Sequence, residues 1–372
     1  MNSRDSGYRS DVQNAPWSIE SLKSEVDSAL SQYVEKSCAS LTAIGPELEA
    51  VAAALRTFTL TSGKRFRPLL ATLGYLATGE QLTPAAFTTL SSLELVHVCA
   101  LIHDDVMDQS DTRRGEPTIH RLFESQHRSE RLQGSSENYG LASSILIGDL
   151  ALVWAAHMSR SGGQEISDLE RFLAIYDEMQ SELMAGQFLD IHEQALGTYS
   201  AERSLKVARY KSAKYSIERP LHCGIALALP QDGERAELLS SHLSSFGLPL
   251  GEAFQLRDDL LGVFGTEAET GKPVGDDLRE GKRTVLLAYA YENATSVQRE
   301  LFDEKIGLSS LSQSEILHLQ EEIIATGAVE KLEALISRLT DESLQSLTAA
   351  PIDSSACALL EDVAIRVTRR KS

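Results

Sequence analysis

The sequence predicts an all-α protein, and three observations support this prediction. Apolar residues recur at three- and four-residue steps through most of the chain, as they do in amphipathic helices. Hydrophobic residues make up 42% of the sequence and aromatic residues only 6%, which fits a large helical core. Strand patterns are nearly absent. Because no linker rich in Pro, Gly or Ser divides the 372 residues, we predict a disordered segment over residues 1–15 and one domain over residues 16–372.

The helices can be placed from this periodicity and from start signals. Thr83-Pro84 joins a capping residue to a proline at the first helical position, so a helix should run from there to Asp108. Residues 124–139 are polar and predict a surface loop. Proline lacks a backbone N–H, so Gly247-Leu248-Pro249 should kink or break a helix. Helices are expected from about Ile19 through Tyr33 and over 83–108, 141–158, 167–194, 201–229, 235–262, 283–294, 313–326, 329–347 and 355–368.

Bulk properties exclude several classes of protein. The formal net charge of −19 argues against binding to nucleic acid or firm attachment to anionic lipid. We find no apolar run of eighteen residues and no signal peptide, so we expect no transmembrane segment and a cytoplasmic location. The isolated cysteines Cys38, Cys99, Cys223 and Cys357 fit reduced thiols rather than a metal or redox centre.

Two aspartate pairs, Asp104-Asp105 and Asp258-Asp259, lie within apolar runs that predict helices. Aspartate is a poor helix former and like charges repel, so a bound cation is needed to offset the cost. Asp108 lies four residues after Asp104 and therefore on the same helix face. Oxygen ligands of this kind suit Mg²⁺. The nearby histidines His97, His103 and His120 lack the spacing of a zinc site.

Cations accompany the first aspartate pair. Thr112-Arg113-Arg114-Gly115 follows it, and residues 63–68, Gly-Lys-Arg-Phe-Arg-Pro, precede it at the start of a helix. Arginine offers a planar fork to phosphate oxygens and lysine a point charge. A strongly acidic chain that gathers cations beside its densest carboxylates is typical of a protein that binds diphosphates through magnesium.

Six motifs in order extend this interpretation: GKRFRP, HDDVMDQSDTRRG, GQFLD, YKSA, FQLRDD and GKPVGDDLREGKRT. They resemble, in order and separation, those of the trans-isoprenyl diphosphate synthases, the polyprenyl synthetase family, over about residues 55–289. The segments KSAKYSIERPLH and DDLLGVFG look most like those of geranylgeranyl diphosphate synthases of actinobacteria. The resemblance implies the isoprenoid-synthase fold, an antiparallel helical bundle with a central active-site cavity, usually as a homodimer.

The resemblance also implies an activity and a set of site residues. Isopentenyl diphosphate would condense head-to-tail with an allylic diphosphate of five, ten or fifteen carbons, on about three Mg²⁺ ions. The metal ligands would be Asp104, Asp108 and Asp258, with Asp105 and Asp259 as further ligands or supports. Isopentenyl diphosphate would be held by Lys64, Arg67, His97 and Arg114, and the allylic diphosphate by Arg113, Lys211, Lys272 and Lys282. Ser212 and Gln255 would join Lys211 beside the reacting carbons, and Gln187 and Asp190 would brace the metal site.

Some positions leave the interpretation open. The second aspartate motif ends in Gly262, where the family often has a carboxylate, and Asp276-Asp277 offer replacement charge. Arg369, Arg370 and Lys371 could close over a substrate, although solvated terminal charge is the simpler reading. In the family, the residues four and five before Asp104 form the floor of the product tunnel.

Here that floor is Ala100 and Cys99, and neither is aromatic, so a product longer than C15 is favoured. We predict geranylgeranyl diphosphate, C20. The alternatives are a farnesyl or a C25 or longer synthase, a class I terpene cyclase, and a non-catalytic partner subunit of a heteromeric synthase.

Overall fold

The predicted all-α class is confirmed. The structure is a computed structural model that describes residues 17–61, 63–229, 233–267 and 273–368, and nearly all of its regular structure there is helical. The strands in these ranges form one two-stranded hairpin. In order, the elements are α1 Ile19–Thr42, η1 Pro46–Leu48, α2 Glu49–Leu60, α3 Phe66–Ala77, α4 Pro84–Met107, β1 Thr112–Arg113, β2 Glu116–Pro117, α5 Ile119–Ser129, α6 Ser136–Met158, α7 Ile166–Leu196, α8 Ala201–Val207, the π-helix η2 Ala208–Glu218, α9 Arg219–Ala228, α10 Gly233–Phe264, α12 Asp276–Glu280, α13 Val285–Asn293, α14 Ser296–Lys305, α15 Gln313–Ala325, α16 Ala328–Thr348 and α17 Ser354–Thr368.

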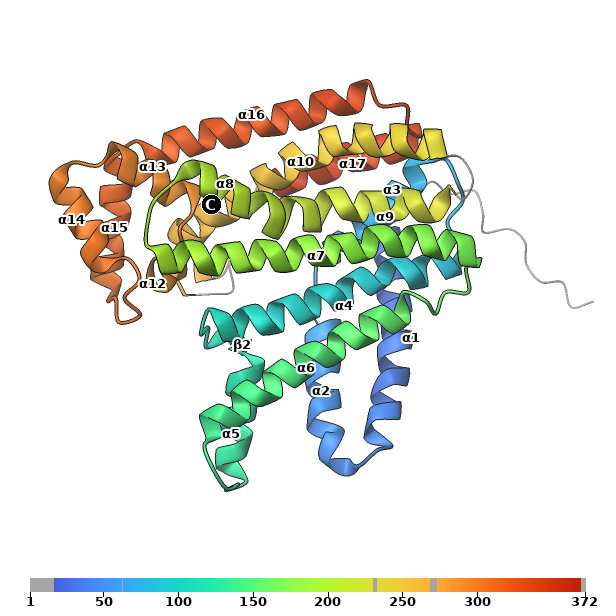
Figure 1. Cartoon of the computed structure of the whole chain (residues 1–372), viewed down its shortest axis with the longest axis horizontal. Helices are drawn as coiled ribbons and strands as arrows, with labels where there is room; N and C mark the ends of the chain where they lie inside the picture. Colours follow the sequence, from blue (N-terminus) through green and yellow to red (C-terminus); the bar gives the residue numbers. More distant parts are fainter. Residues whose placement is uncertain (1–16, 62, 230–232, 268–272, 369–372) are drawn as a thin grey trace, which may run out of the picture.

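The longest helices run along the long axis of the molecule (Figure 1). Helix α4 packs against α6 on one side and α1 on another, while α7 packs against η2 and α9. Helix α10 lies against η2 and α16. The short helices α12 to α15 gather at one end of the bundle, and α1, α2 and α5 project from its lower side (Figure 1).

Two hydrophobic clusters hold these helices together, and α10 contributes to both. Its first half places Leu239, Leu243 and Phe246 in the larger cluster. Its second half places Leu256 and Val263 in a smaller cluster with α13 to α16. The second aspartate pair therefore lies on a helix anchored in apolar packing on both sides of it.

Helix α4 begins and ends where the sequence predicts. The Thr83 side chain accepts a hydrogen bond from the Ala86 backbone N–H, Pro84 is the first helical residue, and Asp108 is the C-cap. Asp104 and Asp105 thus fall in the last turn, at the negative end of the helix dipole, where carboxylates are unfavourable without a cation.

Several predicted boundaries are wrong. Residues 124–129 belong to α5 rather than to a loop, because Ile119 and Phe123 are buried and Phe123 meets Tyr139 of α6. Helices α2 and α14 lie outside the predicted ranges. Residues 201–228 are helical as predicted, but 208–218 form a π-helix.

The predicted break at Pro249 does not occur, since α10 continues through that residue. Proline removes one backbone donor, and packing of α10 against η2 and α16 outweighs that loss. Gly247 contributes, because a Cβ there would lie 3.2 Å from Glu218 Cα of η2.

Two helices are long and apolar enough to cross a membrane by length and composition, which the search for an unbroken apolar run did not anticipate. In α4, 72% of the apolar window is buried inside the molecule, so it is a core helix. In α6 the buried share is 39%. The predicted disorder of residues 1–15 and the role of Arg369, Arg370 and Lys371 lie outside the described residues.

Candidate active site

A cavity of about 920 Å³ opens where α4, η2, α10 and the residues before α3 converge. One part of its wall is acidic and includes Asp104, Asp190 and Asp258. Another part is basic and includes Lys64, Arg67 and Arg114. Segments separated by up to about 200 residues thus meet at one site.

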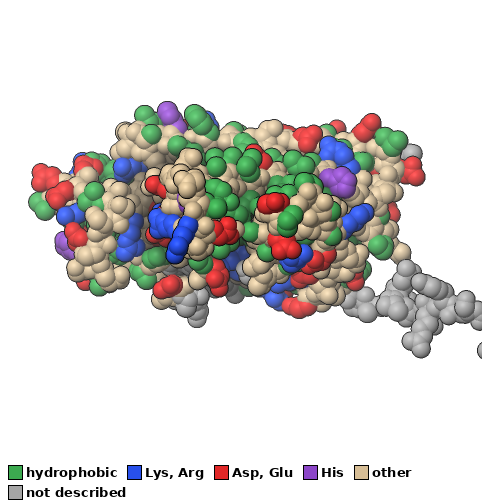
Figure 2. All heavy atoms as spheres, turned by 90° about the horizontal axis from the view of Figure 1, so that it is seen from below, with side chains coloured by type: hydrophobic (Ala, Val, Ile, Leu, Met, Phe, Trp, Pro, Cys, Tyr) green, Lys and Arg blue, Asp and Glu red, His purple; other side chains and the backbone are tan. Residues whose placement is uncertain are grey.

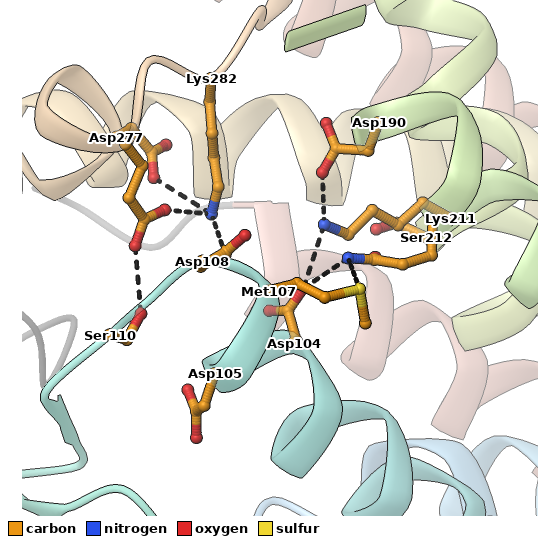
Figure 3. Close-up of polar contacts among 12 residues, drawn as sticks. Asp104, Asp105, Met107, Asp108, Ser110, Asp190, Lys211, Ser212, Asp277 and Lys282 are labelled. Atoms are coloured by element: carbon orange, nitrogen blue, oxygen red, sulfur yellow. Dashed lines mark hydrogen bonds and ion pairs between the residues drawn. The ribbon is translucent and has the colours of Figure 1, made fainter. Parts of the chain in front are cut away.

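Two lysines lie between the carboxylates at the acidic end (Figure 3). Lys211 Nζ is 2.6 Å from Asp190 Oδ2 and 3.4 Å from Asp104 Oδ1. Burial opposes the charge of Lys211, but the two carboxylates outweigh that effect and raise its pKa. Gln187 of α7 donates a hydrogen bond to Asp104 Oδ1 at 2.9 Å. Gln187 and Asp190 therefore brace Asp104 and Lys211.

Lys282 occupies a similar place beside Asp108. Its Nζ is 3.0 Å from Asp108 Oδ2, 2.7 Å from Glu280 Oε2 and 3.7 Å from Asp277 Oδ1. Burial, with Asp104 and Glu280 as neighbouring negative charges, raises the pKa of Asp108 despite the lysine. The end of α4 is therefore crowded with negative charge that a further cation would relieve.

The second aspartate motif is linked to η2 through an amide. Ser212 donates a hydrogen bond to Gln255 Oε1, and Gln255 Nε2 donates to Asp259 Oδ1 at 2.8 Å. Burial, together with the charges of Asp277 and Asp258, raises the pKa of Asp259 to about 8. Asp258 and Asp259 both line the cavity, and Asp259 is buried, with 7% of its surface exposed.

The glycine at the fifth position of this motif has a structural cause. A Cβ at Gly262 would lie 2.0 Å from Asp277 Oδ2 and 2.4 Å from Asp277 Cγ. The Asp277 carboxylate of α12 therefore occupies the space that a side chain at position 262 would need. This supports the expectation that downstream carboxylates replace the missing charge, although it concerns Asp277 rather than Asp276.

At the basic end, the backbone itself is unusual. Arg65 has φ 52°, a left-handed conformation that non-glycine residues rarely adopt. Its guanidinium is buried and lies 2.9 Å from Glu94 Oε1 and 2.6 Å from Asp27 Oδ1. These pairs fix the loop, so that Lys64 and Arg67 on either side of Arg65 line the cavity.

Arg67 is oriented by η2. Its Nη2 donates to Ser216 Oγ at 2.7 Å, and its guanidinium lies 4.3 Å from the centre of the Tyr215 ring. His97 lies in the same part of the cavity. Burial and the charges of Arg67, Arg114 and Arg113 hold its pKa well below the usual value, so the ring is neutral at neutral pH.

Arg113 pairs with the first motif. Its Nη2 and Nε lie 2.6 and 2.7 Å from Asp105 Oδ1, and Nη2 is 3.7 Å from Asp104 Oδ2. Asp105 is only 1% exposed. It therefore anchors Arg113 beside Asp104.

The structure brings most of the predicted site residues together. Those that line the cavity are Lys64, Arg67, His97, Asp104, Arg113, Arg114, Lys211, Gln255, Asp258, Asp259 and Lys282. Three others contact residues of that wall: Asp105 pairs with Arg113, Asp108 with Lys282, and Ser212 donates a hydrogen bond to Gln255. Cys99 and Ala100 do not line the cavity, and Cys99 Sγ lies 3.7 Å from His103 Nδ1, one turn further along α4. Lys272 lies outside the described residues.

Sequence reasoning missed several residues that support the site. Sequence reasoning gave Glu94 no role in the site, yet Glu94 lines the cavity and holds Arg65. Its position three residues before His97 on one helix face was an available signal. Tyr215 had no such signal, because its position depends on the π-helix.

The acidic end suits magnesium in its donor chemistry. Asp104, Asp108 and Asp258 offer hard oxygen atoms. Burial, together with neighbouring carboxylates, raises the pKa of Asp108 and of Asp259, and a bound cation would favour their charged forms. Among the described residues, no three carboxylates or other ligating side chains are already gathered at metal-binding distance. Phosphate oxygens and waters would therefore have to complete the coordination.

Comparisons with known proteins agree with this geometry. Residues 48–323 match the polyprenyl synthetase family. The fold is similar to geranylgeranyl pyrophosphate synthase of Corynebacterium glutamicum in complex with isoprenyl diphosphate and magnesium, with 39% identity, a TM-score of 0.90 and coverage of 95% of this chain and 100% of that one. The chain is 30% identical to geranylfarnesyl diphosphate synthase of Aeropyrum pernix over 80% of this chain and 87% of the relative. It is 29% identical to geranylgeranyl diphosphate synthase of Sulfolobus acidocaldarius over 84% and 88% of the two.

The helical bundle and its two-ended cavity define a trans-prenyltransferase. The match to the family covers about three quarters of the chain. The chain belongs to the polyprenyl synthetase family, and the resemblance predicted from six motifs is confirmed.

Proposed function

We propose that the protein condenses isopentenyl diphosphate with an allylic diphosphate to make geranylgeranyl diphosphate. The observation that carries this proposal is a single cavity lined both by carboxylates, among them Asp104 and Asp258, and by cations, among them Lys64, Arg67 and Arg114. The acidic end suits a diphosphate bound through Mg²⁺ and lysines, and the basic end suits a second diphosphate bound directly by cations. A terpene cyclase has no need of the second subsite.

At the acidic end, Lys211 and Lys282 would hold the allylic diphosphate together with Arg113, and the resemblance adds Lys272 to this set. When bound, Mg²⁺ held by Asp104, Asp108 and Asp258 would supply Lewis-acid stabilisation of the leaving diphosphate. A count of three ions follows from the resemblance. The two lysines add fixed positive charge where the departing diphosphate gains negative charge.

At the basic end, Lys64, Arg67, His97 and Arg114 would hold isopentenyl diphosphate. The allylic carbon–oxygen bond breaks, the double bond of isopentenyl diphosphate forms the new carbon–carbon bond, and loss of a proton gives a product five carbons longer. Gln255 and Ser212 present oxygen atoms beside this path without acting as nucleophiles. Their hydrogen bond would hold the two groups in place beside the developing cation.

Product length is proposed as C20. The similar structure from Corynebacterium glutamicum is a geranylgeranyl pyrophosphate synthase, whereas the relative from Aeropyrum pernix makes geranylfarnesyl diphosphate, so C25 is the alternative. Purified protein, Mg²⁺ and labelled isopentenyl diphosphate with C5, C10 or C15 primers in separate reactions test this. A dominant C20 product supports the proposal, and absence of condensation with every primer would point to a partner subunit or a cyclase.

We also propose a homodimer, with a cytoplasmic location. Large apolar side chains are exposed on α6 and α7: Ile145, Leu146, Val153, Met184, Phe188 and Ile191. Leu146 and Phe188 are each more than 60% exposed. Figure 2 shows apolar side chains exposed among charged ones on the lower side. A second copy covering this surface would account for the low burial of α6, and light scattering of the purified protein tests the mass.

A further inference from the structure

A cluster of partly buried charges lies behind the cavity, on the side of η2 that faces α7. Glu182 of α7 accepts hydrogen bonds from Lys214 and from Arg219, with Arg219 Nε 2.7 Å from Glu182 Oε2. Arg219 also reaches Glu178 at 2.6 Å. None of these residues lines the cavity. The side chains of Lys214, Arg219 and Glu182 are only 12–16% exposed. Each charge therefore needs an opposite charge beside it to offset the free-energy cost of burial.

The cluster continues a row of residues that ends in the active site. Glu178, Glu182, Gly186 and Asp190 follow one another at four-residue steps and so share one face of α7. Each contacts the same stretch of chain. Asp190 holds Lys211 Nζ, a Cβ at Gly186 would lie 2.3 Å from Lys211 N, and Glu182 holds Lys214. This face of α7 therefore lies along η2 and contacts it at successive helical turns.

The segment that this face of α7 contacts is an 11-residue π-helix, η2. Long π-helical runs are rare, because their hydrogen bonds alone do not favour them, and they mark functional sites. Packing must therefore maintain this one. On the opposite side, a Cβ at Gly251 of α10 would lie 2.4 Å from Ala213 Cα, so both neighbouring helices touch its backbone.

The π-helix serves both ends of the cavity. It presents Lys211 and Ser212 toward the acidic end, and Tyr215 and Ser216 toward Arg67. A shift of η2 by about an ångström would displace groups at both subsites, and misplacements of that size cost about 10²-fold in rate.

We propose that Glu182 is a positioning residue for the condensation, acting through Lys214 and Arg219 to fix the register of η2. The charge balance supports this role. Burial opposes ionisation of Glu182, but hydrogen bonds from Arg219 and Lys214 prevail and lower its pKa, so the carboxylate is charged at neutral pH. The inference rests on the proposed roles of Lys211 and Arg67.

Glu182→Gln tests it, because glutamine keeps the size but removes the charge and one acceptor oxygen. Glu178→Gln is the matched control: Glu178 lies one turn away, is half-exposed and contacts Arg219 but not Lys214. We expect kcat to fall at least tenfold in Glu182→Gln and less than twofold in the control, at a temperature where both are folded. Equal kinetics in the two variants would overturn the inference.

A double-mutant cycle with Lys211→Met separates positioning from general stability. If Glu182 acts through η2, Glu182→Gln should cost less in the Lys211→Met background than in the wild-type protein, because the part of the loss that acts through Lys211 is already present there. Full multiplication of the two losses would contradict the inference. Wild-type kinetics of Lys211→Met would instead refute the role proposed for Lys211, so the two failures are distinguishable.

Hydrogen exchange supplies a readout besides activity. Peptides covering residues 208–218 should exchange faster in Glu182→Gln than in Glu178→Gln, while peptides of α4 remain unchanged. Unchanged exchange over 208–218 would also overturn the proposal. If Glu182→Gln does not fold, Lys214→Gln, compared with Lys214→Arg, removes the same contact from the side of η2 and is expected to give the same loss.

Discussion

Replacing Gly262 with aspartate would restore the carboxylate that the family often carries, yet we expect it to impair this protein. The added Cβ would fall 2.0 Å from Asp277 Oδ2, well inside contact distance. Asp277 is only 9% exposed and its carboxylate pairs with Lys282, so it cannot simply turn into solvent. Helix α12 would have to move.

The cost can be estimated from two effects. Overpacking of a well-filled site typically costs about 1–3 kcal/mol. Two carboxylates about 4 Å apart repel by about 4 kcal/mol at an effective dielectric constant of about 20, and protonation of one of them limits that penalty. Taking about 2 kcal/mol as the surviving cost, and about 1.3 °C per kcal/mol for a chain of 372 residues, because the entropy of unfolding is about 2.1 cal/mol/K per residue, we expect Tm to fall by about 2–3 °C.

The assay is thermal unfolding together with kcat at saturating Mg²⁺. Gly262→Ala is the control for size without charge, and it should lose stability but retain more activity than Gly262→Asp. Removing the obstructing side chain, in Gly262→Asp with Asp277→Ala, should recover at least part of the lost Tm. A Gly262→Asp variant with wild-type Tm and kcat would refute the view that Asp277 fills this space.

Three further predictions concern other parts of the site. Because the pKa of His97 is lowered in the folded protein, only the unfolded chain gains a proton at this residue below about pH 6.5. The free energy of unfolding should therefore decrease as the pH is lowered, by up to about 1.4 kcal/mol per pH unit. In His97→Gln this part of the decrease should be missing when urea unfolding is measured from pH 7 to pH 5.5. Identical slopes would count against it. Mg²⁺ with inorganic diphosphate, at about 100 times its Kd, should stabilise the protein by about 2.7 kcal/mol over protein in chelator, as measured by thermal unfolding, and an equal gain in Asp104→Asn would exclude that carboxylate as a ligand. Ala100 does not line the cavity, and only the resemblance to the family places it at the tunnel floor. On that basis Ala100→Phe should shift the main product from C20 toward C15 in a primer-extension assay, and an unchanged C20 product would place the tunnel floor elsewhere.

The sequence alone determined the class of fold and most of the site, because both depend on local patterns. Helical periodicity and the Thr83-Pro84 start placed α4, and the position of Asp104 relative to Asp108 followed from the helix repeat. The cation motifs could be recognised because an acidic chain that places Lys and Arg beside its densest carboxylates is typical of a protein that binds a further anion there, such as a diphosphate. Two residues four apart in a helix lie on the same face of that helix whatever the tertiary structure around it.

Tertiary structure decided what depends on contacts between distant segments. The π-helix over 208–218 is set by the close approach of Gly186 and Gly251 from two neighbouring helices, which no local propensity encodes. Pro249 remains inside a helix because packing outweighs one lost hydrogen bond. The missing carboxylate at Gly262 became intelligible only when Asp277 was found in its place, since that space is shared by residues from two different helices.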